Sequence, residues 1–336
     1  MPFGSSKAAI LGAAGAGGFG YEYSGSKNEY TNWNSTGYTF VELTTSGNLE
    51  FTGDGTIDMV VVGGGGGYDV GSSTNNENGG GGGGGVVQVT GFEVIAETIS
   101  VTIGAKGTWA TSGGGQSGTN GGQTELTMNG VNIAAGGGGR GGMGGWAYCS
   151  SGQDAPALTS PPSGWGSITR ASGGGGGGGG RWYTYCGSSG GAGRAGLYAG
   201  TPASGTWWPN EESSLGTGGA GGGGEQWASG GGAGGGAGGG YDTNLANFQK
   251  GSQRTGDGAH QGGQGTRWQD YGYGKNGSVS TTTNAFYGSG DGPGQDMYPF
   301  DNSFTYSSWG KGAAWVDGAA HGESQDGVVI LRFADI

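Results

Sequence analysis

The sequence predicts a protein of mainly β and non-regular structure, with a small β-sheet region, a polyglycine II helix bundle and almost no α-helix. Three observations lead to this prediction. Glycine accounts for 94 of the 336 residues, yet only 8 prolines and no Gly-X-Y repeat occur, which excludes collagen. Aromatic residues are frequent and charged residues few, the reverse of a disordered chain. Strand-like alternation is present, whereas a 3.6-residue helical period is missing.

Strand-like stretches define a β-rich region over residues 38–135. Within it, residues 38–64 contain three short apolar–polar alternations separated by turn residues, and residues 86–107 contain two more. Residues 124–135 predict a hairpin, because the pair Asn129-Gly130 suits the two central positions of a type I′ turn. The region is therefore expected to form a sheet of short strands.

A closing strand is predicted within residues 326–336, where the stretch DGVVILRF is unusually apolar for this chain. A short apolar run of this kind is consistent with a fully buried strand, so we expect it to lie centrally, beside the similar run MVVVGG. The first and last strands would then pair and clamp the chain between them. Residues 1–37, rich in glycine, alanine and serine, are interpreted as an extended attachment segment.

Residues 136–325 consist of glycine-rich tracts separated by loops, without helical or strand periodicity. Glycine has no side chain to bury, so order in these tracts has to come from backbone hydrogen bonds. A polyproline II helix has three residues per turn and no internal hydrogen bonds, which leaves its N–H and C=O groups for neighbouring helices. Only glycine lets backbones approach so closely. We therefore expect residues 136–325 to form a polyglycine II bundle with aromatic loops.

The loops combine Trp and Tyr with Ser, Asn, Gly and Asp, a composition typical of antibody binding loops. Two interpretations stand. The rings cover a bundle that has no side-chain core, or they contact a receptor, for which flat aromatic faces beside Asp and Asn suit sugars. The candidate receptor contacts are Trp146, Tyr148, Trp165, Trp182, Tyr183, Tyr185, Trp207, Trp208, Trp268, Tyr271, Tyr273, Tyr298, Phe300 and Trp309.

The sequence predicts no enzyme, no cofactor and no metal site. Its two histidines, His260 and His321, lie apart from any Gly-x-Ser-x-Gly motif and are expected to be polar loop residues. The acidic loop at residues 290–296 lacks the EF-hand spacing of a calcium site. The formal net charge of −12 opposes nucleic-acid binding. No apolar run reaches the length of a membrane-spanning helix, so membrane insertion is not expected.

Several stretches, taken in order, resemble the glycine-rich domain of bacteriophage tail-fibre proteins. They are Met59–Gly67, Val101–Gly107, the glycine runs and the closing stretch Gly327–Phe333, and the resemblance covers about residues 38–333. The chain is also similar to the adhesins that cap long tail fibres, in which polyglycine II helices present variable loops to the host receptor. The resemblance implies a non-enzymatic virion protein that binds a host surface glycan or outer-membrane protein through its aromatic loops.

The same resemblance implies assembly in the bacterial host cytoplasm and docking of residues 1–37 on other tail or baseplate proteins. Fibre proteins are often trimers, so it also allows a homotrimer. Two other interpretations remain. The chain could be a purely structural component of a virion or extracellular filament, without receptor binding. The chain could also be an ice-binding protein, which would display a flat face of the bundle.

Cys149 and Cys186 each follow a tyrosine shortly after a glycine tract. If those tracts are neighbouring helices, both cysteines emerge near a helix end and can form a disulfide. A disulfide between them would stabilise the folded protein by roughly 3–4 kcal/mol in the chain-entropy model, because it restricts the unfolded chain. The alternative is two free, partly buried thiols at opposite ends of the bundle.

Overall fold

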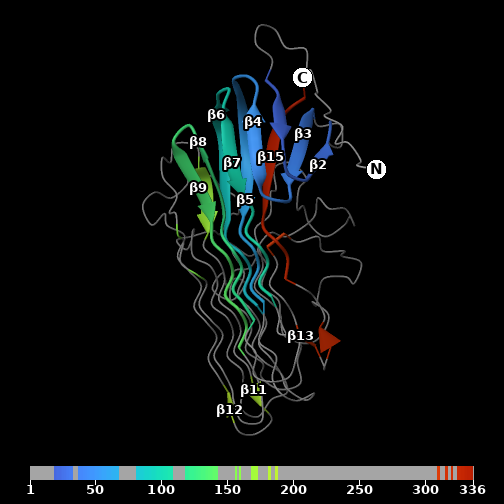
Figure 1. The fold of residues 1–336 in the computed structure, drawn as a ribbon, viewed down its shortest axis with the longest axis vertical. Helices are drawn as coiled ribbons and strands as arrows, with labels where there is room; N and C mark the ends of the chain where they lie inside the picture. Colours follow the sequence, from blue (N-terminus) through green and yellow to red (C-terminus); the bar gives the residue numbers. More distant parts are fainter. Residues whose placement is uncertain are drawn as a thin grey trace, which may run out of the picture.

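The computed structural model contains strands, turns and extended segments, with no helix among the residues that it describes (Figure 1). The prediction of a mainly β fold with almost no α-helix is confirmed for this part of the chain. The described residues are 19–32, 37–67, 81–108, 118–142, 156, 159, 168–172, 181–182, 186–187, 309–310, 315–316, 319–320 and 324–335.

Five antiparallel strands form the first sheet, in the order β1-β4-β7-β8-β9. The hairpin between β8 and β9 turns at Asn129 and Gly130, whose φ angles of 47° and 72° are those of the predicted type I′ turn. The strands are β1 (Tyr21–Tyr23), β4 (Gly47–Phe51), β7 (Thr98–Thr102), β8 (Thr124–Met128) and β9 (Val131–Ala135).

Six antiparallel strands form the second sheet, in the order β10-β6-β5-β15-β3-β2. The closing strand β15 lies between β5 and β3, so the predicted central position and the pairing of first and last predicted strands are confirmed. The strands are β2 (Lys27–Tyr30), β3 (Tyr38–Leu43), β5 (Gly55–Val62), β6 (Val86–Val94), β10 (Ile168–Ser172) and β15 (Val328–Ala334).

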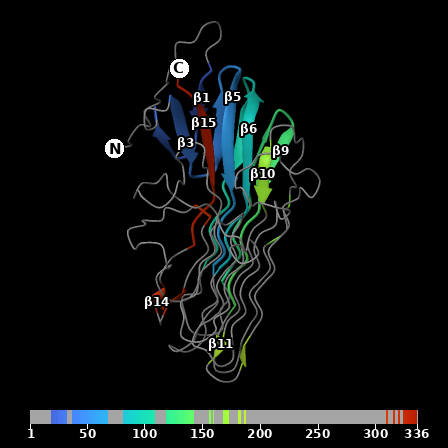
Figure 2. The same cartoon turned by 180° about the vertical axis from the view of Figure 1, so that it is seen from behind.

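The two sheets face each other and enclose the apolar core (Figures 1 and 2). Alternate residues of the six-stranded sheet, such as Val41, Met59 and Leu331, meet inward residues of the five-stranded sheet, such as Ile99 and Leu126. Strand β7 alternates between exposed and buried positions, as one solvent-facing side requires, whereas β15 is buried from Val328 to Arg332. The centre of the six-stranded sheet is therefore covered on both faces, which explains its continuous apolar sequence.

Several strands were not predicted. Strands β1 and β2 lie within residues 1–37, the expected attachment segment, and β1, with three residues, is too short to show an alternating pattern. Residues 136–325 contain β10 and two small hairpins, although no strand period was found there. The hairpin strands have two residues each: β11 (Arg181–Trp182), β12 (Cys186–Gly187), β13 (Trp315–Val316) and β14 (Ala319–Ala320).

Candidate functional site: a glycine array

Glycine-rich segments leave one end of the sandwich and run side by side away from it (Figures 1 and 2). Each of them continues a strand, so neighbours in the chain run in opposite directions. We call these segments, together with Gly310, the glycine array. The segments are 63–67 after β5, 81–85 before β6, 104–108 after β7, 118–122 before β8, 136–141 after β9 and 324–327 before β15.

The hydrogen bonds of segment 63–67 repeat every three residues. The N–H groups of Gly63 and Gly66 donate to segment 81–85, at the carbonyl oxygens of Gly85 (2.9 Å) and Gly82 (2.8 Å). The N–H groups of the following residues, Gly64 and Gly67, donate to segment 118–122, at Gly122 (2.9 Å) and Thr119 (3.0 Å). Successive residues thus face different neighbours, and the same neighbour returns after three residues.

Segment 63–67 lies at the centre of the array. Besides the two neighbours above, it accepts hydrogen bonds from segments 136–141 and 104–108, and Gly65 donates to Gln325 in segment 324–327 (3.0 Å). Gly310 completes the ring around it. The carbonyl oxygen of Gly310 accepts a hydrogen bond from Gly84 (2.8 Å), and its N–H donates to Asp326 (2.8 Å). The central segment is thus enclosed by backbone on all sides.

Backbone contacts leave no space for side chains at the centre. A Cβ atom added to Gly63, Gly64, Gly66 or Gly67 would lie far inside the 3.0 Å that real Cβ atoms keep from their neighbours. In each case the nearest atom is a backbone oxygen of an adjacent segment, which cannot rotate away as a side chain does. Close approach of backbones therefore requires glycine at these positions.

Two of the outer segments, 104–108 and 118–122, carry side chains at two positions of every three. In segment 104–108, Gly104 and Gly107 are buried, whereas the intervening Ala105 and Lys106 are exposed. Segment 118–122 repeats this arrangement, with Gly118 and Gly121 buried and two exposed polar residues between them. A G-x-x-G spacing therefore marks these two outer segments, whereas unbroken glycine occurs both in the central segment 63–67 and in residues 81–85 and 136–139 of other outer segments.

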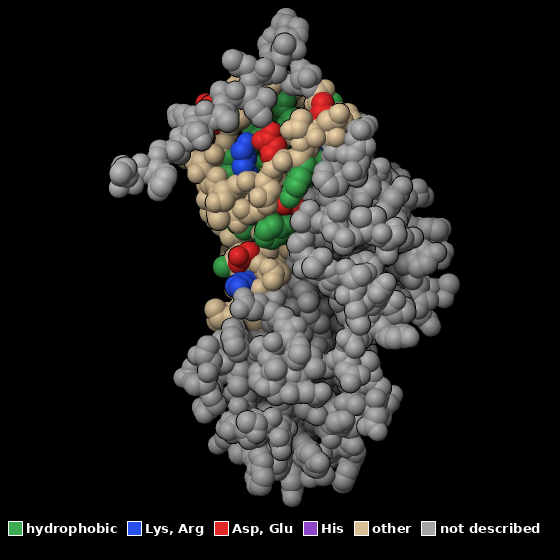
Figure 3. Space-filling model, turned by 90° about the vertical axis from the view of Figure 1, so that its right-hand side faces the viewer, with side chains coloured by type: hydrophobic (Ala, Val, Ile, Leu, Met, Phe, Trp, Pro, Cys, Tyr) green, Lys and Arg blue, Asp and Glu red, His purple; other side chains and the backbone are tan. Residues whose placement is uncertain are grey.

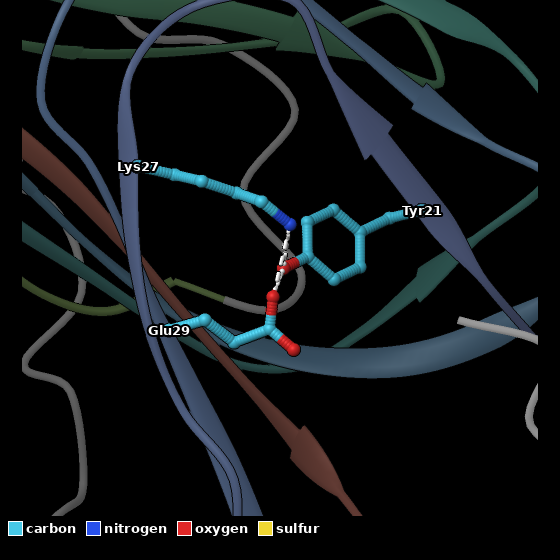
Figure 4. Close-up of polar contacts among 3 residues, drawn as sticks. All are labelled: Tyr21, Lys27 and Glu29. Carbon is cyan, nitrogen blue, oxygen red and sulfur yellow. Dashed lines mark hydrogen bonds and ion pairs between the residues drawn. The ribbon is translucent and has the colours of Figure 1, made fainter. Parts of the chain in front are cut away.

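A polar cluster lies at one edge of the sandwich, where the edge strands β1 and β2 meet (Figure 4). Lys27 Nζ donates to the Tyr21 hydroxyl (2.7 Å) and to Glu29 Oε2 (2.9 Å), and the Tyr21 hydroxyl donates to Glu29 Oε2 (2.7 Å). Burial and the nearby Glu29 carboxylate raise the pKa of Tyr21. Burial alone would raise the pKa of Glu29, but its hydrogen bonds and the charge of Lys27 together lower it.

A buried ion pair lies on the other face of the six-stranded sheet. Arg332 of β15 contacts Asp58 of β5, and the two residues are only 4% and 8% exposed. Asp58 Oδ1 also accepts a hydrogen bond from Gly91 N–H (2.6 Å), where β6 bulges and Gly91 has a φ of 63°. Burial lowers the pKa of Arg332 to about 10, which leaves it charged at neutral pH. Asp58 of β5 thus links β15, through Arg332, to β6, through Gly91.

The described surface mixes charges of both signs. On the face in Figure 3, basic side chains lie beside acidic ones, with hydrophobic side chains between them. Among the described residues, no group of three or more His, Cys, Asp or Glu is arranged to hold a metal ion. Neither the polar cluster nor the ion pair contains a histidine or a cysteine. The glycine array is therefore the distinctive functional candidate in this part of the chain.

The structure describes few of the predicted contact residues. Trp309 is partly buried and precedes Gly310, which is hydrogen-bonded within the array. Trp182 of β11 is paired with Cys186 of β12. The remaining candidate contacts and Cys149 lie outside the described residues, so the receptor surface and the disulfide stay predictions. Residues 63–122 were assigned to the β-rich region, although segments of the array lie there and the G-x-x-G spacing of two of them is visible in the sequence.

Comparison with known proteins assigns no family. A search against models of protein families finds no match for this chain, and neither does a search of curated proteins. Within the described residues, no helix is long and apolar enough to cross a membrane. The function has to be argued from the chain itself.

Proposed function

We propose that this chain is a non-enzymatic receptor-binding protein of a bacteriophage tail, in which a polyglycine II bundle presents aromatic loops to a host surface. The observation that carries the proposal is the three-residue repeat of hydrogen bonds around segment 63–67. A polyproline II helix has three residues per turn and directs its unpaired backbone groups outward. The same neighbour should then return every third residue, as it does for the pairs made by Gly63 and Gly66.

The proposal extends the array into residues 136–325, where glycine-rich tracts continue the composition of the described segments. A bundle held by backbone hydrogen bonds needs no side-chain core, so aromatic residues between the tracts are available for other roles. Loops on a rigid scaffold are a common place for binding residues. Tyr and Trp supply large contact areas at a low entropic cost, which suits recognition of a surface glycan or an outer-membrane protein.

Attachment to the virion is assigned to the N-terminal part, with one adjustment to the predicted limits. Phe19 stacks on Phe51 (5.7 Å between ring centroids) and contacts Phe333 (5.2 Å), so the chain has joined the sandwich by residue 19. Docking on other tail or baseplate proteins is therefore proposed for residues 1–18. Assembly in the host cytoplasm and a homotrimeric state belong to the same proposal.

One observation favours the purely structural alternative. Trp309 is partly buried beside a residue of the array, as expected of an aromatic ring that covers the bundle. If all the aromatic candidates did the same, the protein would be a stiff virion or filament component without a receptor.

Cell binding separates the two functions. The full chain, fluorescently labelled, is incubated with a panel of bacterial strains and with purified lipopolysaccharide. We expect saturable binding to at least one strain, weakened about tenfold or more by the double variant Trp207→Ser, Trp208→Ser. The control is Ile95→Ser, which removes a side chain that is 50% exposed on the sandwich. Binding to no strain, or equal binding by both variants, contradicts the proposed role of the loops.

A further inference from the structure

The hydrogen-bond register of the sheets continues without a break into the glycine array. At the end of the β5–β6 pair, Val62 lies opposite Val86. One step further, Gly63 donates to Gly85, and three residues beyond that Gly66 donates to Gly82. The two segments run antiparallel, so each residue further along one segment is paired with one residue earlier in the other. The register of the β5–β6 pair is therefore kept in the array.

Three other strand pairs behave in the same way, without exception among the described segments. The register of each pair in its sheet predicts which array residues are bonded. For β7 and β8, the sheet pair Val101–Leu126 continues in the array as the pairs Ala105–Gly122 and Thr108–Thr119. For β8 and β9, the sheet pair Thr124–Ala135 continues as Gly121–Gly138. For β5 and β15, the sheet pair Val62–Val328 continues as Gly65–Gln325.

The array adds bonds that the sandwich cannot make. Packed sheets lie about 10 Å apart, because the core side chains separate them. Beyond the last core residues the sequence changes to glycine, and backbone from one sheet bonds directly to backbone from the other. Gly64, after β5, donates to Gly122, before β8, and Gly85, before β6, donates to Gly136, after β9. In the array, segments that continue the two sheets are thus joined directly by backbone hydrogen bonds.

We infer that the β-sandwich is the template on which the glycine array forms, setting the direction, register and rotational phase of every segment. Glycine runs have no side-chain pattern to select a register, and glycine-rich pairing is prone to slip. The sandwich has such a pattern, since a shift of one residue would turn core residues such as Leu126 and Leu331 outward. It also holds the ends of the segments together, so each needs less loop closure to find its neighbours.

The order of folding tests this inference in the unmodified full chain. The protein is refolded from denaturant, pulsed with deuterated solvent at increasing times, and digested for mass spectrometry. Peptides covering β5 and β15 should become protected before peptides covering segments 63–67 and 136–141. Simultaneous protection, or earlier protection of the glycine segments, would overturn the template role.

A pair of variants tests the same dependence at equilibrium. Leu126→Ala opens the sandwich core, whereas Gly121→Ala places a Cβ against a backbone oxygen of the central segment. Leu126→Ala should speed amide exchange in both the strands and the array. Gly121→Ala should speed it in the array while β5 and β15 keep wild-type protection. The control Ala105→Ser, at an exposed outer position of segment 104–108, should change neither.

Two results at equilibrium would contradict the inference. Array amides that stay protected in Leu126→Ala would mean that the array forms without the sandwich. Strands that lose protection in Gly121→Ala to the same extent as the array would mean that neither region templates the other. If Leu126→Ala fails to fold, the refolding measurement on the wild-type chain decides alone.

Discussion

The sandwich and the glycine array pack consecutive stretches of the same chain segments in two different ways. In the sandwich, side chains such as Met59 and Leu126 fill the space between backbones. In the array, the backbones themselves fill that space, and their carbonyl and N–H groups bond in several directions. The difference shows what a side chain contributes. A side chain keeps two sheets apart and specifies the register of its strand. Without side chains the backbones pack closely, but nothing in their sequence specifies the register.

The two regions should differ most sharply in their response to added volume. Gly64→Val places a Cβ against the backbone oxygen of Ala105 at the centre of the array. Because a backbone oxygen cannot rotate away, we expect a loss of unfolding free energy above the ~1–3 kcal/mol of ordinary core overpacking. Thermal melting measures the loss. The matched control Ala105→Val, at an exposed outer position, should melt near the wild-type temperature. Equal melting of Gly64→Val and wild type would mean that segment 63–67 is not packed.

The buried ion pair sharpens the comparison, because side-chain interactions can be replaced and backbone packing cannot. Asp58→Leu leaves Arg332 buried without this partner and should destabilise the fold by about 3–5 kcal/mol. The double variant Asp58→Leu, Arg332→Met removes both charges and should recover much of that loss, as measured by urea unfolding. If the double variant is no more stable than Asp58→Leu, Asp58 acts chiefly through the bulge at Gly91.

The sandwich could be predicted from the sequence more fully than the glycine array. Alternation of apolar and polar residues predicted β7 and β8, and the pair Asn129-Gly130 predicted the turn between β8 and β9. Both features depend directly on the side chains present. The unbroken apolar run of β15 indicated burial on both faces. Strand β2 was missed because Lys27 and Glu29 lie opposite the core residues Leu43 and Val41, so charges stand where an alternating pattern predicts apolar residues.

Composition predicted a polyglycine II bundle in residues 136–325, most of which lie outside the described residues, so that bundle stays a prediction. Long glycine runs drew the prediction to residues 136–325, whereas the described array begins at Gly63. Segments 104–108 and 118–122 are recognisable only by the spacing of their buried glycines, because ordinary side chains occupy the two positions between them. Which segments become neighbours could not be predicted from glycines at all. That information lies in the register of the strands, which only the folded sandwich reveals.

Insertions at the junction of the two regions test the three-residue period. One glycine added between Ile103 and Gly104 would move Lys106 to the buried position of Gly107, and two would move Ala105 there. Each should cost about 2–3 kcal/mol, since a side chain then meets backbone. Three added glycines restore the G-x-x-G phase and should cost less than about 1 kcal/mol. Tolerance of the two-glycine insertion alone would instead indicate a pleated strand with a period of two.

The smallest expected effect on stability lies at the edge of the sandwich, where the interacting side chains are partly exposed. Lys27 and Glu29 are inward charges on edge strand β2, a device that discourages pairing with a second copy. The pKa of Glu29 is lowered in the folded state, so its contribution is present above the ordinary value of 4.5 and lost as the pH falls below it. The pair is partly exposed, and we expect this contribution to be under about 1 kcal/mol.

Urea unfolding at pH 7 and at pH 3 measures that contribution, with Glu29→Gln as the variant. Wild type should be slightly more stable than Glu29→Gln at pH 7, and the difference should shrink at pH 3, where the carboxylate takes up a proton. A difference that grows at low pH would mean that burial, which raises the pKa of Glu29, outweighs its bonds to Tyr21 and Lys27. If the edge charges also prevent strand pairing, the double variant Lys27→Val, Glu29→Val should form dimers or larger species by light scattering, whereas Glu29→Gln, which keeps Lys27, stays in its wild-type state.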